Sequence, residues 1–124
     1  MKSLYLFKNY VYLVPYIKNH KANIIGVLIM TKIDILNFLR ENKIEIQEKF
    51  GVQKIALFGS YAKDSANDNS DIDIAIESKQ KDFFVRDDLR EYLEKHFKKP
   101  VDVGYIDSFR EFYKQKIEKE LIYV

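Results

Sequence analysis

Apolar residues recur at helical spacing between residues 31 and 50, which predicts an amphipathic helix there. Thr31, with Asp34 three residues later, is typical of a capping box at a helix start. We expect a break near Asn42 and an end at Gly51, which suits the left-handed position after a helix. The apolar positions are Ile33, Leu36, Leu39, Ile46 and Phe50.

Two further patterns each predict a strand. Residues 52–58 form an apolar run that leads into Gly59-Ser60 and predict a buried strand ending in a turn. Tyr61 opens a short predicted helix over residues 61–63, and the polar residues 64–70 predict a loop. Residues 71–76 alternate with period two. One face of this second strand carries Ile72, Ile74 and Ile76, and the other carries Asp71, Asp73 and Ala75.

The last third of the chain predicts a helix, a strand and a terminal helix. Residues 82–98 are amphipathic with one apolar face, and Pro100 is expected to end that helix. Residues 101–105 alternate again and place Asp102 on the face opposite its two flanking valines. Residues 109–124 have apolar side chains at helical spacing and predict the last helix.

This order of elements predicts an α/β (α+β) fold, in which a small mixed β-sheet has helices packed on one side. We expect one domain over residues 30–124, because Met30-Thr31 stands directly before the first well-formed helix start. Residues 1–29 are then an N-terminal extension of uncertain role. Two interpretations stay open for it: an appendage outside the functional module, or an extra element packed on the core.

Composition restricts the function classes. The chain has 124 residues with 47% hydrophobic and 32% charged residues, an ordinary globular balance. The net charge of +2 comes from interspersed charges, a balance that neither demands nor excludes a polynucleotide partner. We expect no direct nucleic-acid binding. The absence of cysteine excludes disulfides and thiolate chemistry. No apolar run approaches the roughly 20 residues of a membrane span. We therefore expect a cytoplasmic protein without a membrane partner.

The paired carboxylates carry the first chemical signal. Asp71 and Asp73 lie on one face of an isoleucine-rich strand, roughly 7 Å apart at the Cα atoms, where they can converge on one cation. Mg²⁺ typically takes one or two carboxylates and completes its shell with water and phosphate oxygens. If the strand of Asp102 lies beside theirs, this third carboxylate allows a second metal ion.

Gly59-Ser60 carries the second signal. A strand turns there into a short helix, so free backbone N–H groups and a hydroxyl can bind an anion. Lys63, one turn later, adds positive charge for a triphosphate. Each feature alone is more often a turn, a solvated lysine or the solvent face of a strand. Together, in this order and on these elements, they favour a phosphate and metal site.

These motifs resemble a known signature. Residues 57–63, Leu-Phe-Gly-Ser-Tyr-Ala-Lys, together with residues 70–74, Ser-Asp-Ile-Asp-Ile, are similar to those of the DNA polymerase β-type nucleotidyltransferase superfamily. More narrowly, the chain resembles the minimal nucleotidyltransferases, the MntA-like antitoxins paired with HEPN-domain toxins. The similarity runs from about residue 30 to the end and implies the nucleotidyltransferase fold.

The resemblance implies a role for each site residue. Gly59 and Ser60 would bind the triphosphate of ATP. Asp71 and Asp73 would bind two Mg²⁺ ions, and Asp102 would complete the metal site and help to activate the acceptor hydroxyl. One position departs from the pattern, because many relatives carry Arg-Gly where this chain has Lys63-Asp64. Lysine keeps the charge there but lacks the bidentate guanidinium.

The resemblance also implies the reaction. AMP would pass from ATP to a hydroxyl, expected to be a tyrosine, of a HEPN-domain RNase toxin, which is thereby silenced. A toxin-binding antitoxin without catalysis is one alternative. The other is nucleotidyl transfer to a small molecule such as an aminoglycoside. This second alternative is disfavoured because the sequence offers no region for an acceptor-binding domain.

Overall fold

The computed structural model describes residues 3–7, 10–14, 21–22 and 28–124. Its first four strands form two separate antiparallel pairs, β1 with β2 and β3 with β4. All four lie within the N-terminal extension, whose other residues fall outside the described parts of the chain. The division between an extension and a domain at residue 30 stays a prediction. The bounds are β1 Ser3–Phe7, β2 Tyr10–Val14, β3 Lys21–Ala22 and β4 Leu28–Ile29.

The predicted first helix is confirmed together with its break. Helix α1 (Lys32–Glu41) begins with a complete capping box between Thr31 and Asp34. Asn42 separates it from α2 (Lys43–Phe50). Gly51 then has φ +66°, the left-handed conformation that glycine adopts without strain, and it redirects the chain into the sheet.

A four-stranded mixed sheet has the order β7-β6-β5-β8, in which β8 is the short strand Ile122–Tyr123. Strand β5 (Val52–Phe58) runs antiparallel to β6 (Ile72–Ser78), and β6 runs parallel to β7 (Val101–Tyr105). The second and third predicted strands are therefore neighbours, which meets the condition on which the proposed role of Asp102 depended. A short helix, α3 (Gly59–Ala62), follows β5 directly and begins two residues earlier than predicted.

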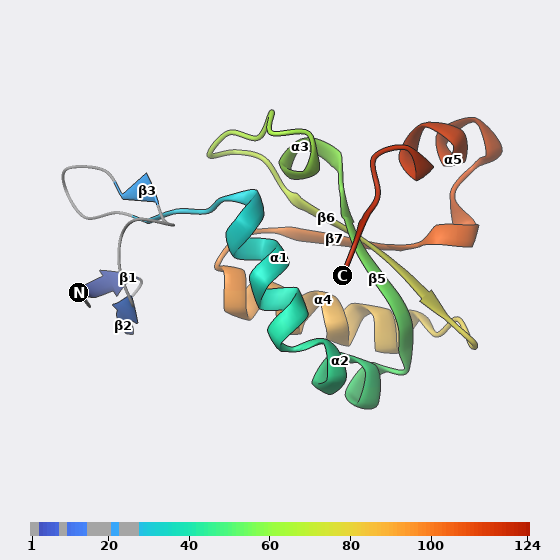
Figure 1. The fold of residues 1–124 in the computed structure, drawn as a ribbon. Coiled ribbons are helices and arrows are strands. Elements are labelled where there is room, and N and C mark those ends of the chain that lie inside the picture. Colours follow the sequence, from blue (N-terminus) through green and yellow to red (C-terminus); the bar gives the residue numbers. More distant parts are fainter. Residues whose placement is uncertain (1–2, 8–9, 15–20, 23–27) are drawn as a thin grey trace.

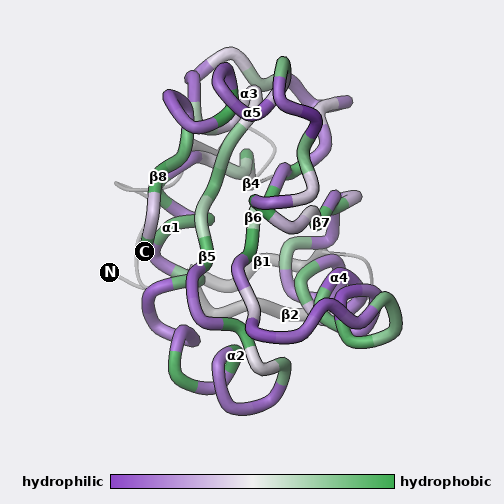
Figure 2. The backbone as a smooth tube through the Cα atoms, turned by 90° about the vertical axis from the view of Figure 1, so that its right-hand side faces the viewer, coloured by the Kyte–Doolittle hydropathy of each residue, from purple (hydrophilic) through white to green (hydrophobic). Residues whose placement is uncertain are grey.

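The core lies between one face of this sheet and the longer helices. Ile72, Ile74 and Ile76 of β6 are almost fully buried, as the period-two pattern predicts. Figure 1 shows α2 and α4 (Phe83–Phe97) on one side of the strands and α3 and α5 (Glu111–Glu118) on the other. Figure 2 shows a green, hydrophobic stretch along β6. The predicted α/β class with a small mixed sheet is confirmed, and α3 and α5 lie on the side opposite the longer helices, where no helix was expected.

The last two predicted helices differ at their ends from the sequence-based expectations. Helix α4 ends at Phe97, where the cap residue Lys98 has φ +56°, before Pro100 is reached. The predicted terminal helix over residues 109–124 is wrong at both ends. A 3₁₀ turn, η1 (Ile106–Ser108), precedes α5 (Glu111–Glu118), and strand β8 (Ile122–Tyr123) follows it. Strand β8 forms because the outer edge of β5 needs backbone partners, which residues 122–124 supply.

None of the helices in the described part of the chain is both long and apolar enough to cross a bilayer.

Candidate active site

The sheet register brings the predicted carboxylates together. Asp73 of β6 stands opposite Asp102 of β7 in the parallel pairing, at the strand spacing of roughly 4.8 Å. Asp71 lies just before β6, whose first residue is Ile72, and is exposed. Both neighbours of Asp102 along β7 are buried while Asp102 itself is exposed. The three aspartates therefore share one end of the sheet on the face away from the core.

Burial and the neighbouring carboxylates change the pKa of Asp73. Partial burial, and then the negative charges of Asp102 and Asp71, raise the pKa of the Asp73 carboxyl from 3.8 to about 6. Lys63 acts in the opposite direction and lowers that pKa, so its ammonium group lies within electrostatic reach of the same carboxyl. A half-buried carboxylate beside two others is a group that a bound cation would stabilise in its charged form.

Gly59 is packed directly against Asp73. A Cβ atom on Gly59 would lie 2.1 Å from Oδ2 of Asp73, a distance that no packed atom can occupy. Gly59 also has φ +73°, in the left-handed region. The glycine is therefore required twice, for its backbone conformation and for the room that the carboxylate takes. This contact supplies a reason for the Gly-Ser pair that the sequence pattern alone did not give.

Ser60, the next residue, is half-buried at the start of α3. Its carbonyl oxygen accepts hydrogen bonds from the backbone N–H and from Oγ of Ser65, at 2.9 and 3.4 Å, which fold the following loop back onto α3. Its own hydroxyl bonds to no other residue in the described regions. The turn thus holds a free hydroxyl beside the glycine that contacts Asp73.

Lys63 has a partner that sequence reasoning missed. Its Nζ lies 3.4 Å from Oε1 of Glu120, which follows α5 and is largely buried. Glu120 also raises the pKa of Asp73, so it belongs to the same electrostatic cluster. No sequence motif marks Glu120, because it reaches the site only when β8 pairs with β5. The cation predicted to face a triphosphate is therefore held by a carboxylate from the other end of the domain.

The departure at Lys63-Asp64 also has a structural context. Asp64 has φ +58°, a conformation that favours glycine, the residue found there in many of the relatives that the motif resembles. An ion pair of 2.8 Å between the Asp64 carboxylate and Nζ of Lys32 fastens this residue to α1. The pair offsets part of the backbone strain.

An aromatic contact closes the same face of the sheet. The ring of Phe109 lies over Gly104, where a Cβ would be 3.0 Å from the ring. It meets Phe58 edge-on at 5.5 Å between ring centroids. Gly104 is two residues from Asp102 along β7, and Phe58 is opposite Asp73 in the antiparallel pairing. The chain after β7 is therefore anchored beside the carboxylates.

The donor set suits a hard divalent cation. Carboxylate oxygens on adjacent strands are magnesium ligands, and their mutual repulsion at Asp73 is relieved by positive charge. Within residues 29–124, no three His, Cys, Asp or Glu side chains are already arranged to enclose a metal ion. An open set of this kind fits Mg²⁺, which usually keeps water and substrate phosphates in its shell.

Comparison with known proteins defines the class. Residues 39–124 match the family described as the nucleotidyltransferase domain, a range that includes every site residue predicted above. A protein of Methanocaldococcus jannaschii, whose name proposes protein adenylyltransferase activity, is 40% identical over 95 residues, covering 73% of this chain and 95% of that protein. The protein adenylyltransferase MntA of Thermococcus cleftensis is 31% identical over 96 residues, covering 77% and 97%.

Among solved structures, a chain of a toxin–antitoxin complex with AMP-PNP superposes with a TM-score of 0.57 at 28% identity, covering 76% of this chain and 72% of that one. By fold and motif the protein is a nucleotidyltransferase. The chain belongs to the nucleotidyltransferase domain family, among the MntA-like minimal members. The resemblance predicted from residues 57–63 and 70–74 is thereby confirmed.

Proposed function

We propose that this protein transfers AMP from ATP to a hydroxyl group, most simply a tyrosine, of a HEPN-domain toxin, and so acts as its antitoxin. The observation that carries the proposal is the register of Asp73 with Asp102, one strand apart, with Gly59 packed against Asp73. Both features lie at one end of one sheet, which supports a turn that binds phosphate beside a pair of metal-binding carboxylates.

The three aspartates would hold the metal. Asp71, Asp73 and Asp102 are assigned to two Mg²⁺ ions. When bound, these ions would stabilise the charge on the attacking and leaving oxygens of the phosphoryl group. The raised pKa of Asp73 supports this assignment, because a nearby cation would stabilise the ionised form of a carboxyl crowded by other negative charges.

The other residues bind and position the nucleotide. The free Ser60 hydroxyl and the backbone beside Gly59 would donate to oxygens of the triphosphate. Lys63 would exchange its contact with Glu120 for one with a phosphate oxygen. The acceptor oxygen would attack the α-phosphorus in line, forming a P–O bond as the bond to pyrophosphate breaks, and Asp102 would help to take the hydroxyl proton.

The partner is inferred from the relatives. A structure similar to this chain is a toxin–antitoxin complex with an ATP analogue, and one relative is named a protein adenylyltransferase. We propose the same kind of acceptor for this chain. A cytoplasmic location, where ATP is available, is part of the proposal and is consistent with a chain free of cysteine.

Transfer of label tests this function. The protein is incubated with Mg²⁺, ATP labelled at the α-phosphate and a candidate HEPN-domain toxin. We expect label on the toxin with the wild-type protein. Asp73→Asn should lower the rate by at least about 1000-fold, the order of effect expected when an electrostatic stabiliser of the transition state is lost.

Asp68→Asn serves as the matched control, because Asp68 is an exposed residue of the adjoining loop. It should leave the rate unchanged. Label on an aminoglycoside instead of the toxin would identify the small-molecule alternative. Protection of cells by Asp73→Asn without any label would identify neutralisation by binding. Either result would contradict the proposal.

A further inference from the structure

A recess outside the candidate active site lies beside Asp102, on the side away from Gly59. It has a volume of about 200 Å³ and lies between β7 and the first half of α4. Its lining consists of Arg86, Asp87, Arg90, Asp102 and Val103. Because the sheet order is β7-β6-β5, the residues run across the sheet from Gly59 to Asp73, then Asp102, then this recess.

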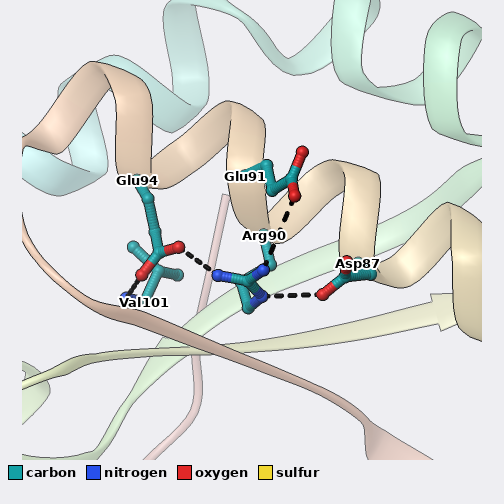
Figure 3. A network of polar contacts seen from close by, with 5 residues as sticks. All are labelled: Asp87, Arg90, Glu91, Glu94 and Val101. Carbon is teal, nitrogen blue, oxygen red and sulfur yellow. Dashed lines mark hydrogen bonds and ion pairs between the residues drawn. The ribbon is translucent and has the colours of Figure 1, made fainter.

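The positive charge of Arg90 is already balanced by ion pairs with carboxylates of α4. Its Nε lies 2.8 Å from Oδ1 of Asp87, and its guanidinium also contacts the carboxylate of Glu94. Figure 3 shows Arg90 between these carboxylates. Its Nη2 also lies 3.9 Å from Oε1 of Glu91. A guanidinium bound on several sides has few donors left for a ligand. Arg90 therefore forms a fixed wall of the recess.

Glu94 fastens this wall to the sheet. Its second oxygen, Oε2, accepts a hydrogen bond of 3.1 Å from the backbone N–H of Val101. Val101 directly precedes Asp102 on β7, whose outer edge has no strand partner in the described sheet. The chain of contacts from Arg90 through Glu94 to Val101, drawn in Figure 3, thus fixes the edge strand at the point where Asp102 emerges.

Arg86 differs from Arg90, although it lies one helical turn before it on the same face of α4. Its guanidinium carbon is 5.0 Å from the centroid of the Phe83 ring, and no carboxylate of the described residues is paired with it. A cation–π contact of this kind does not need an N–H donor of the guanidinium. Within the described residues, the recess therefore contains one arginine whose donors are not used in an ion pair.

We propose that this recess is an acceptor-side anion subsite, in which Arg86 binds an anionic oxygen group lying next to the hydroxyl that receives AMP. The proposal rests on the proposed function, because the recess adjoins the site through Asp102. Two sources have this chemistry: the carboxylate of an acidic residue beside the acceptor tyrosine, and the phosphodiester of an AMP already attached. A planar guanidinium binds either in a bidentate manner.

Binding measured without transfer tests the subsite. The full-length protein is saturated with AMP-PNP and Mg²⁺, so that the triphosphate side is filled. It is then titrated with AMP, with N-acetyl-Glu-Tyr-amide, and with the neutral N-acetyl-Gln-Tyr-amide. The Nε–Hε resonance of Arg86 is followed by NMR. We expect this resonance to shift with at least one anionic probe and not with the neutral dipeptide.

The variants give the comparison. Arg86→Gln should weaken the anionic probe about tenfold or more, the loss expected for a hydrogen bond between charged groups. Arg86→Lys should recover only part of that affinity, since the bidentate fork is lost. Arg40→Gln, at an exposed position on α1, should change nothing. The anionic probe that binds identifies the source of the anion.

Three results would overturn the subsite: no shift with either anionic probe, an equal shift with the neutral dipeptide, or unchanged affinity in Arg86→Gln. A wild-type protein that transfers no label to the toxin would be a separate result. It would count against the proposed function and would leave the binding measurement intact.

Discussion

Gly59 makes the sharpest prediction at the scale of single residues. Gly59→Ala would place a methyl group 2.1 Å from Oδ2 of Asp73 and would also strain a backbone with φ +73°. We expect a loss of about 2–4 kcal/mol in the free energy of unfolding, from backbone strain plus overpacking. Displacement of Asp73 should also abolish label transfer. Urea denaturation and the transfer assay measure the two effects.

Gly51 provides the matched control, because it has nearly the same φ, +66°, but has no atom within 4 Å of a Cβ. Gly51→Ala should cost only the backbone strain, about 1–2 kcal/mol, and should leave transfer intact. Equal losses in the two variants would show that the contact with Asp73 has no energetic effect.

The Asp73 carboxyl predicts a pH dependence. Its pKa in the folded, metal-free protein is about 6, above the ordinary 3.8. The folded state therefore holds more protons than the unfolded state between about pH 4 and pH 6, so the free energy of unfolding should fall as pH rises through that range. Asp73→Asn should remove this fall.

Carbon-detected NMR of the Asp73 carboxyl checks the value directly. We expect a midpoint near pH 6 without metal, a lower midpoint with Mg²⁺, and a lower midpoint in Asp102→Asn, which removes one repelling charge. A midpoint near 4 in the metal-free protein would show that the three carboxylates do not interact as described.

Sequence reasoning at this scale reached the residues whose spacing is local. Gly59-Ser60 and Asp71-x-Asp73 are read within one strand and one turn, and the structure places all four at one end of the sheet. Glu120 could not be found in this way. Its contact with Lys63 depends on pairing between β5 and β8, which are far apart along the chain.

Strand β8 is the element to test, because the sequence predicted a helix there. Residues 117 and 121 fit a helical period, but the exposed edge of β5 supplies backbone groups that residues 122–124 satisfy. The backbone N–H of Val124 donates to the carbonyl oxygen of Ile55 at 3.1 Å. Long-range pairing of this kind outweighs local propensity and leaves no local signal.

We expect Ile122→Lys to lower the free energy of unfolding by about 1–3 kcal/mol, because this side chain packs against the core. Tyr123→Lys, on the exposed face of the same strand, should stay within about 0.5 kcal/mol of wild type. Thermal or urea unfolding compares them. Rapid hydrogen exchange at the Val124 amide in the wild-type protein would contradict the strand.

At the scale of the whole molecule, the order of strands arranges the chemistry along one direction. The turn after β5 carries the proposed triphosphate contacts, β6 and β7 carry the carboxylates, and the recess beyond β7 carries Arg86. The amphipathic patterns predicted the layers of this fold. They left open whether β7 lies beside β6, on which the place of Asp102 depends, and the structure confirms that it does.

Anomalous diffraction from crystals grown with Mn²⁺ and AMP-PNP tests the central claim most directly. Mn²⁺ replaces Mg²⁺ at oxygen ligands and can be located by its anomalous signal. We expect manganese peaks between the carboxylates of Asp71, Asp73 and Asp102, with the triphosphate lying towards Ser60. Manganese and triphosphate bound elsewhere, with these three carboxylates free of metal, would contradict it.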